Sequence, residues 1–211
     1  MSSRCLIISG GAFCVLPEDL RTADYVIACD RGYLHARRMG IVPDLIVGDF
    51  DSAPAPATAI PVEQVPSEKD DTDTMLAARR AAGFGCTEAV IGCCFGGRLD
   101  HTLANLQTAA WLAERGVRVR LTGADTDAYV ISAGVLRIPR REGWSLSVFS
   151  LTDRCEGVSI KGTKYDAERI TATNAFPVGV SNCWISENAE ISLQKGILLI
   201  MESRLEKGEH I

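Results

Sequence analysis

The first half of the chain alternates short apolar runs with stretches of helical periodicity. Apolar runs predict strands near residues 5–8, 25–29, 44–47, 89–91 and 117–121. Between them, apolar positions spaced three and four residues apart predict helices over 32–39, 73–82 and 100–115. Continuous apolar runs are typical of parallel strands that are covered on both faces. The alternation therefore predicts an α/β fold with an open, mainly parallel sheet and flanking helices.

The second half has a different pattern, without helical periodicity. Short strand candidates separated by turn residues lie near 129–131, 135–138, 145–149, 157–160, 191–193 and 197–201. Many short strands with turns between them predict an antiparallel β-sandwich or barrel. We therefore expect two domains, an α/β domain over 1–125 and an antiparallel β domain over 126–211.

Composition and charge narrow the class of protein. The chain has 211 residues and a formal net charge of −5, so an extended nucleic-acid surface, which needs dense Lys and Arg, is not expected. No apolar run approaches the length of a membrane helix, and the run near residue 7 is too short for a signal-peptide core. The eight cysteines form no C-x-x-C pair, and several lie in apolar strand-like runs. We expect reduced, mostly buried thiols and a cytoplasmic location.

Acidic residues gather where the predicted strands end and the predicted helices begin. In an open parallel sheet these junctions lie along one edge, where ligands bind. Carboxylates about 4 Å apart repel by about 4 kcal/mol at an effective dielectric near 20, so a cluster of them calls for cations or protons. Oxygen ligands without nearby His or Cys favour Mg²⁺, which commonly bridges carboxylates to substrate phosphates. The acids are Asp30, Asp49, Asp51, Asp70, Asp71, Asp73 and Asp100.

Each group of acids also has a structural alternative. Asp49 and Asp51 would point to the same side of an extended segment and share a cation, or they are simply turn residues. The run 70–73 and Asp100 would equally well cap the helices that follow them. The segment 96–98 is either a tight turn or an anion-binding nest at a helix start. The joint pattern favours a metal–phosphate site over these separate alternatives.

Motifs of several common nucleotide and metal sites are absent from the sequence. There is no G-x-x-x-x-G-K-[ST] string, and no G-x-G-x-x-G string follows the first predicted strand. No stretch has the ligand spacing of an EF-hand loop. A P-loop kinase, a dinucleotide-binding fold and an EF-hand protein are therefore not expected.

Several strings together resemble the thiamine pyrophosphokinase family. The most specific are G-D-F-D-S at 48–52 and G-G-R-L-D-H at 96–101, and all of them run in the family's order over nearly the whole chain. The others are D-R-G at 30–32, K-D-D-T-D at 69–73, Asn105, G-T-K-Y at 162–165 and G-V-S-N at 179–182.

The resemblance implies an enzyme. Its reaction would transfer the pyrophosphoryl group of ATP to the hydroxyl of thiamine, giving thiamine diphosphate and AMP, with Mg²⁺ as cofactor. It also implies an α/β N-terminal domain, a thiamine-binding and dimerisation β-sandwich domain, and a homodimer. Positioning and charge neutralisation would carry most of the rate in such a reaction.

The resemblance also implies roles for particular residues. The metal-binding and nucleophile-orienting acids would be Asp49, Asp51, Asp73 and Asp100, with Asp70 as a further metal candidate and Arg98 at the transferred group. The residues that bind nucleotide or thiamine would be Asp30, Gly97, Arg98, His101, Ser181, Asn182 and Trp184. Asp71 lies where the family varies, so no role is predicted for it. Trp184 would stack on the thiamine ring, or it is a core or interface aromatic.

Three other functions compete with this interpretation. A haloacid-dehalogenase-type, Mg²⁺-dependent phosphatase also uses paired aspartates, but its pair follows an early strand. A glycosyltransferase with a metal-binding D-x-D is usually longer. A non-catalytic module that senses a nucleotide or small ligand would keep the same binding residues, so sequence alone leaves it open.

Overall fold

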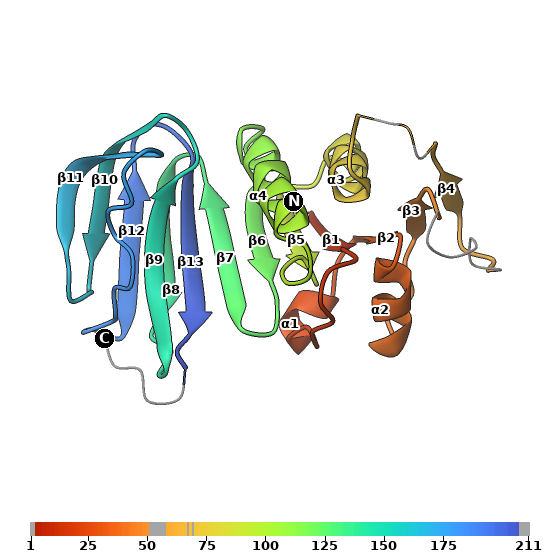
Figure 1. Cartoon of the computed structure of the whole chain (residues 1–211), viewed down its shortest axis with the longest axis horizontal. Helices are drawn as coiled ribbons and strands as arrows, with labels where there is room; N and C mark the ends of the chain where they lie inside the picture. The colour runs from red at the N-terminus through yellow and green to blue at the C-terminus, as the bar shows by residue number, and fades with distance from the viewer. Residues whose placement is uncertain (1–2, 51–57, 67, 69, 207–211) are drawn as a thin grey trace. The chain divides into compact units, whose positions relative to one another are not determined.

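The computed structural model describes residues 3–50, 58–66, 68 and 70–206 (Figure 1). The chain divides into two compact units, Met1–Ala124 and Asp125–Ile211. No helix among the described residues has the length and apolar character needed to span a membrane.

The first unit is built on parallel strands, as the apolar runs predict. The strands lie in the order β4-β3-β2-β1-β5-β6, and each neighbouring pair is parallel. Their bounds are β1 Arg4–Ile8, β2 Tyr25–Cys29, β3 Leu45–Gly48, β4 Val62–Gln64, β5 Glu88–Gly92 and β6 Arg118–Thr122. Because β1 has β2 on one side and β5 on the other, the chain changes direction across the sheet at β1, which is the switch point where α/β sheets bind ligands.

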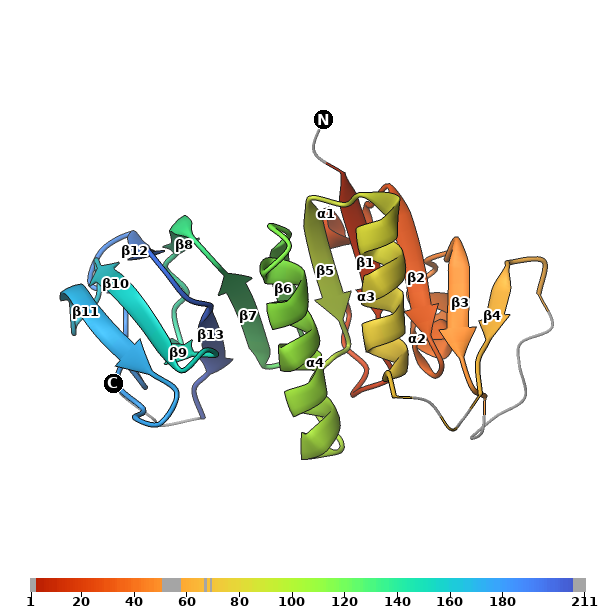
Figure 2. The ribbon, with the colours of Figure 1, turned by 90° about the horizontal axis from the view of Figure 1, so that it is seen from above.

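Helices cover both faces of this sheet (Figure 2). Helices α3 and α4 lie on one face, and α1 and α2 lie on the other. Their bounds are α1 Glu18–Arg21, α2 Gly32–Arg38, α3 Asp73–Phe84 and α4 Leu99–Ala113. The central strands β1, β2 and β5 are buried, which explains why their sequences are continuously apolar rather than alternating.

Two local features fix where the helices begin. Thr72 caps α3 by accepting a hydrogen bond from the Met75 N–H at 3.1 Å. Helix α2 begins against the carboxyl end of β1, where a Cβ on Gly32 would lie 1.9 Å from the Ile8 carbonyl oxygen. Only glycine allows this approach, so Gly32 brings the start of α2 to the edge where the strands end.

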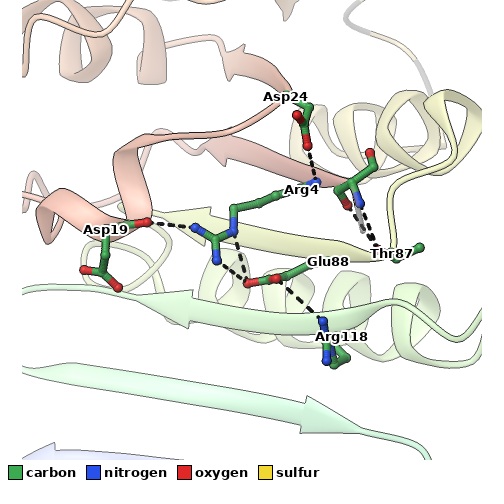
Figure 3. A network of polar contacts seen from close by, with 7 residues as sticks. Arg4, Asp19, Asp24, Thr87, Glu88 and Arg118 are labelled. Atoms are coloured by element: carbon green, nitrogen blue, oxygen red, sulfur yellow. Dashed lines mark hydrogen bonds and ion pairs between the residues drawn. The ribbon is translucent and has the colours of Figure 1, made fainter. Parts of the chain in front are cut away.

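Charged side chains tie the opposite, amino-terminal ends of the strands together (Figure 3). Arg4 at the start of β1 pairs with Glu88 at the start of β5 at 2.9 Å, and Glu88 also lies 3.8 Å from Arg118 at the start of β6. The Arg4 N–H donates to Asp24 at 2.8 Å, and its guanidinium donates to the Asp19 carbonyl at 2.7 Å. These partly exposed pairs contribute little stability each. They lie at the edge of the sheet opposite the edge that carries the acids.

The second unit is an antiparallel β-sandwich. Strands β7, β13 and β9 pair in that order, and β11, β10, β12 and β8 form a four-stranded sheet. One apolar core contains residues from both groups of strands. The bounds are β7 Thr126–Ile131, β8 Gly134–Pro139, β9 Trp144–Ser150, β10 Arg154–Lys161, β11 Ala167–Thr173, β12 Asn188–Leu193 and β13 Leu198–Arg204.

The fold class predicted from the sequence is confirmed in both units. All eight cysteines lie in the described part of the chain, where seven are buried, the eighth, Cys183, is half-buried, and none forms a disulfide. The thiols therefore behave as the sequence predicts, mainly as small buried apolar groups.

Candidate active site

A cavity of about 680 Å³ opens at the carboxyl-terminal edge of the parallel sheet. Its wall comes from the loops that follow β1, β2, β3 and β5 and from the first turns of α3 and α4. It therefore lies at the switch point beside β1, where the fold is expected to bind a ligand. The lining residues are 9–12, 29–31, 49, 71–74, 94, 96–98, 101, 104 and 105.

Three of the predicted acids line this cavity together. Asp30 follows β2, Asp49 follows β3, and Asp73 is the first residue of α3. The Asp30 N–H donates to the Val47 carbonyl at 2.8 Å, which holds the loop after β2 against the end of β3. Burial raises the pKa of the Cys29 thiol, and the charges of Asp73 and Asp30 raise it further. The charges of Asp30 and Asp73 therefore both act on the Cys29 thiol, and Cys29 also lines the cavity.

Asp71 also lines the cavity, although the sequence assigned it no role. Its carboxylate accepts two hydrogen bonds from Arg79, at 2.7 and 3.3 Å. This two-fold contact offsets the charge of Asp71 and directs its oxygens to α3. The Asp71 carboxylate is thus occupied by an arginine of α3, which makes it a weaker candidate for a metal ligand than Asp73.

Glycine-rich loops form another part of the cavity wall. Gly96 and Gly97 have φ values of +80° and +73°, in the left-handed region that glycine adopts without strain. Arg98 precedes α4 without a side-chain cap, so the N–H groups of Leu99 and Asp100 face outward from the helix start, while the His101 N–H donates to the Asp100 carboxylate. Such a turn before a helix is a suitable binding site for phosphate groups.

Arg98 and Asp100 form an ion pair at the rim of the cavity. The guanidinium donates to the carboxylate at 3.1 and 2.5 Å, and the side chains are 74% and 61% exposed. The Arg98 hydrogen bond lowers the pKa of the Asp100 carboxyl, and the His101 N–H also donates to it at 2.9 Å. Arg98 and His101 line the cavity, whereas Asp100 lies outside its lining.

Neutral polar side chains complete the lining. The Ser9 and Thr74 hydroxyls are 2.9 Å apart and buried, and they connect the end of β1 to α3. The Asn105 amide donates to the Cys94 carbonyl at 2.8 Å and holds the loop after β5 against α4. Both contacts make the cavity walls rigid.

The structure brings together part of the site expected from the sequence. Asp70 is exposed and, like Asp100, does not line the cavity, and Asp51 lies outside the described residues. Among the described residues, no three His, Cys, Asp or Glu side chains are close enough to hold a metal ion by themselves. The predicted residues that share the cavity are Asp30, Asp49, Asp73, Gly97, Arg98 and His101.

Sequence reasoning did not assign roles to several lining residues. The Ser-Gly-Gly string directly after the first strand is a signal that could have found three of them, because small residues at that position let a ligand approach the backbone. Thr74 carries no such signal, since it lies inside a helix, whereas Arg31 and Asn105 belong to the strings that resemble the family. The residues are Ser9, Gly10, Gly11, Arg31, Thr74 and Asn105.

The residues expected to contact thiamine all lie in the second unit. Asn182 is 2% exposed, and its amide donates to Thr163 Oγ1 and the Tyr165 carbonyl, each at 3.0 Å, and accepts from the Tyr165 N–H at 3.0 Å. Trp184 is 6% exposed in the sandwich core, and its Nε1 donates to the Ile138 carbonyl at 3.2 Å. Asn182 and Trp184 thus fix this segment, and their predicted thiamine contacts stay predictions.

Ser181 occupies the neighbouring turn. Its φ is +56°, in the left-handed region, and its N–H donates to Ser147 Oγ at 3.1 Å. The side chain is exposed beside the segment that Asn182 holds. Its predicted contact with thiamine is likewise still a prediction.

Two family models match this chain. The model for "Thiamin pyrophosphokinase, catalytic domain" matches residues 16–121, and the model for "Thiamin pyrophosphokinase, vitamin B1 binding domain" matches residues 135–198. The first match contains most of the loops that line the cavity, and the second contains Ser181, Asn182 and Trp184.

Proteins named thiamine pyrophosphokinase are similar to this chain over nearly their full length. The thiamine pyrophosphokinase of Bacillus subtilis (strain 168) is 27% identical over 93% of this chain and 97% of its own length. A crystal structure of the Bacillus subtilis protein superposes with a TM-score of 0.83 at 26% identity and covers 95% of this chain and 99% of that one. A thiamin pyrophosphokinase family protein from Enterococcus faecalis gives a TM-score of 0.76 at 29% identity, covering 96% and 99%. Because both family models match, and match in order along the chain, the chain belongs to the thiamin pyrophosphokinase family.

Proposed function

We propose that this protein is a thiamine pyrophosphokinase that transfers the pyrophosphoryl group of ATP to the hydroxyl of thiamine. The products are thiamine diphosphate and AMP. The observation that carries the proposal is a cavity that combines four carboxylates with a glycine-rich helix start, in a chain that belongs to this family. Neither a phosphatase nor a non-catalytic sensing module receives support from the comparisons.

The triphosphate of ATP binds at the glycine-rich wall. Gly96 and Gly97 turn the chain so that the first turn of α4 meets the ligand with its N–H groups, and negative charge is stabilised there by the helix dipole. Arg98 adds a planar cation suited to two phosphate oxygens at once. Because Arg98 is paired with Asp100 at the exposed rim, the triphosphate competes with that carboxylate for the guanidinium.

Mg²⁺ fits the part of the cavity that the acids line. Asp30, Asp49 and Asp73 supply only oxygen ligands, which is the donor set that Mg²⁺ prefers. Mg²⁺ usually binds one or two carboxylates, several waters and substrate phosphates, so a complete protein cage is not required. Asp49 and Asp73 would hold the ion, and Asp51 is a further ligand by its spacing. When bound, the ion neutralises charge on the phosphate oxygens.

The outer acids have secondary roles in this proposal. Asp70 and Asp100 stay candidates for the metal site, although neither lines the cavity. Asp100 also holds Arg98 at the rim, which keeps the guanidinium near the position of the phosphates. Asp30 would contact the ribose or the metal, and His101 would contact the triphosphate.

The reaction itself is a substitution at phosphorus. The thiamine hydroxyl oxygen forms a bond to the β-phosphorus, the bond from that phosphorus to the oxygen bridging to the α-phosphorus breaks, and AMP leaves with that oxygen while the hydroxyl proton is released. The residues of this chain act by holding the two substrates in line and by compensating charge. Arg98, at the rim, would stabilise the charge that develops on the transferred group.

We further propose that the protein works as a homodimer in the cytoplasm. The second unit exposes several apolar side chains on the segment that also carries Ser181, namely Phe176, Val178, Val180 and Ile185, which are 40–69% exposed. Exposed apolar residues gathered in one segment favour a protein interface. Ser181, Asn182 and Trp184 would bind or shape the thiamine site at this interface. Eight cysteines without a disulfide suit a reducing compartment.

The products of one reaction test the proposal. The protein is incubated with thiamine, Mg²⁺ and ATP labelled in either the α- or the γ-phosphate. We expect equal amounts of AMP and thiamine diphosphate, with the γ-label in thiamine diphosphate and the α-label in AMP, and no turnover when a chelator removes the metal. Formation of ADP or free phosphate would contradict the proposal, and ATP binding without turnover would support a sensing module instead.

A further inference from the structure

The loop that follows β1 forms one wall of the cavity, and a histidine outside the cavity holds this loop from behind. His35 lies on α2, and its Nε2 is 2.9 Å from the Gly11 carbonyl oxygen. Because a carbonyl oxygen only accepts hydrogen bonds, Nε2 must carry the proton and donate. Gly11 lines the cavity and His35 does not, so the contact reaches the cavity only through the backbone of the loop.

A second contact attaches the same loop to α2. The Phe13 ring lies with its centroid 5.5 Å from that of His35, at an interplanar angle of 51°. The guanidinium carbon of Arg38 lies 3.8 Å from the Phe13 ring centroid. His35 and Arg38 are three residues apart and therefore share one face of α2. This face of α2 therefore contacts the loop at Phe13 as well as at Gly11.

The other side of the loop is attached to the segment after β5. The Gly11 N–H donates to the Cys93 carbonyl, and the Ala12 N–H donates to the Phe95 carbonyl, both at 2.9 Å. A Cβ on Gly11 would lie 2.6 Å from the Cys93 oxygen, so the two loops are as close as backbones can pack. The Gly11–Ala12 peptide is therefore fixed at both ends, its C=O by His35 and its N–H by Phe95.

We propose that His35 is a positioning residue for ATP, which holds the Gly11 carbonyl and thereby fixes the backbone wall against which the nucleotide binds. This inference rests on the proposed function. Glycine has more conformational freedom than any other residue type. A loop that contains both Gly10 and Gly11 therefore needs external contacts to stay in one conformation. His35 supplies one such contact from α2, in addition to those with the Cys93 and Phe95 carbonyls.

The consequence of losing the contact falls on ATP binding. The loop would sample several conformations, and binding would have to select the one that fits. A single hydrogen bond of this type changes an equilibrium by roughly 3- to 10-fold. We expect the Kd and the KM for ATP to rise by about this factor, while kcat and the KM for thiamine change less than about twofold.

Substitutions at His35 separate hydrogen-bond donation from ring packing. His35→Phe keeps a ring against Phe13 but removes the donor. His35→Gln restores an amide donor near the position of Nε2, and His35→Glu has the same shape but only accepts. Arg37→Gln is the matched control, because Arg37 is exposed on the same helix two residues after His35.

The assay measures ATP binding to the full chain by titration calorimetry, together with KM, kcat and thermal denaturation. We expect His35→Phe and His35→Glu to weaken ATP binding, His35→Gln to recover most of the affinity, and Arg37→Gln to bind like the wild type. The inference is overturned if His35→Phe binds ATP normally, if His35→Gln does not recover, or if ATP and thiamine lose affinity equally with a matching loss of melting temperature. If His35→Phe fails to fold, the difference in ATP affinity between His35→Gln and His35→Glu tests the inference instead.

The binding measurement also separates this inference from the proposed function. If the wild type binds ATP but never turns over thiamine, the proposed reaction fails and the comparison among the His35 variants still stands. If the wild type does not bind ATP, both are wrong.

Discussion

In the second unit, Arg141 contacts two buried acids. Asp127 on β7 and Glu202 on β13 lie directly opposite each other, and their side chains are 7% and 1% exposed. The Arg141 guanidinium lies 2.6 Å from the first carboxylate and 3.4 Å from the second. Its carbon atom Cζ also lies 3.5 Å from the centroid of the Trp144 ring. The Arg141 guanidinium therefore contacts two buried anions.

We predict that Arg141→Met lowers the free energy of unfolding by about 3–5 kcal/mol, the cost of removing one partner from a buried ion pair. Methionine keeps much of the apolar volume against Trp144, so the loss comes mainly from charge. Two carboxylates about 4 Å apart would also repel by about 4 kcal/mol at an effective dielectric near 20, which sets the same scale. This loss would be a large fraction of the stability of a typical domain.

Urea denaturation followed by tryptophan fluorescence measures the change, and hydrogen exchange in β7 and β13 assigns it to the second unit. The matched control is Arg137→Met, because Arg137 pairs with Glu190 at 3.0 Å with both side chains exposed, 75% and 39%. We expect the control to lose about 0–1 kcal/mol. Adding Asp127→Asn to Arg141→Met should recover part of the stability. A loss in Arg141→Met no larger than in the control would refute this account of the buried charges.

Three further predictions concern the cavity. Asp73→Asn should lower kcat/KM by at least about 100-fold, the scale of a lost charge contact at a transition state, while Asp71→Asn, which loses a carboxylate already paired with α3, should stay within about tenfold in the same steady-state assay. Gly11→Ala should weaken ATP binding in calorimetry because its Cβ would lie 2.6 Å from a backbone oxygen, whereas Gly83→Ala on α3, with nothing within 4 Å, should bind ATP normally. Arg98→Lys keeps the charge but loses the planar fork, so kcat should fall roughly 10-fold, or about 1.4 kcal/mol. Equal effects of the two aspartate variants, of the two glycine variants, or an unchanged kcat in Arg98→Lys would each contradict the corresponding role.

Much of the fold follows from apolar periodicity, and the elements that were missed have little of it. Strand β4, Val62–Gln64, has only three residues and none of them is buried. Helix α1, Glu18–Arg21, has four residues and buries only Leu20. Strand β11, Ala167–Thr173, is an edge strand in which Ala172 alone is buried. Elements with so little buried surface leave no pattern in the sequence from which to infer them.

The candidate site was predictable where it depends on topology. Asp30, Asp49 and Asp73 share a cavity because strand ends meet at one edge of a parallel sheet, which the sequence pattern already implies. Asp100 differs because its direction depends on the first turn of α4 and on the neighbouring Arg98, which alternation of strands and helices does not determine.

The contacts of loops were beyond the reach of sequence patterns. His35 looks like an ordinary polar residue in a short helix, and its contact with Gly11 depends on how the loop after β1 returns over α2. Trp184 was compatible with either a ligand contact or a core position, and only the packing of the sandwich assigns its ring to the core. Such contacts join residues far apart in the chain without a local signal.

One measurement tests the central claim, that the acids at this sheet edge hold ATP through a divalent ion. The protein is crystallised with Mn²⁺ and α,β-methylene-ATP, whose α–β bridge resists cleavage, and the metal is located by anomalous scattering. The account predicts a peak inside the cavity, about 2.1 Å from carboxylate oxygens of Asp49 or Asp73 and in contact with the triphosphate. A nucleotide bound elsewhere, or a metal peak away from both carboxylates, would contradict it.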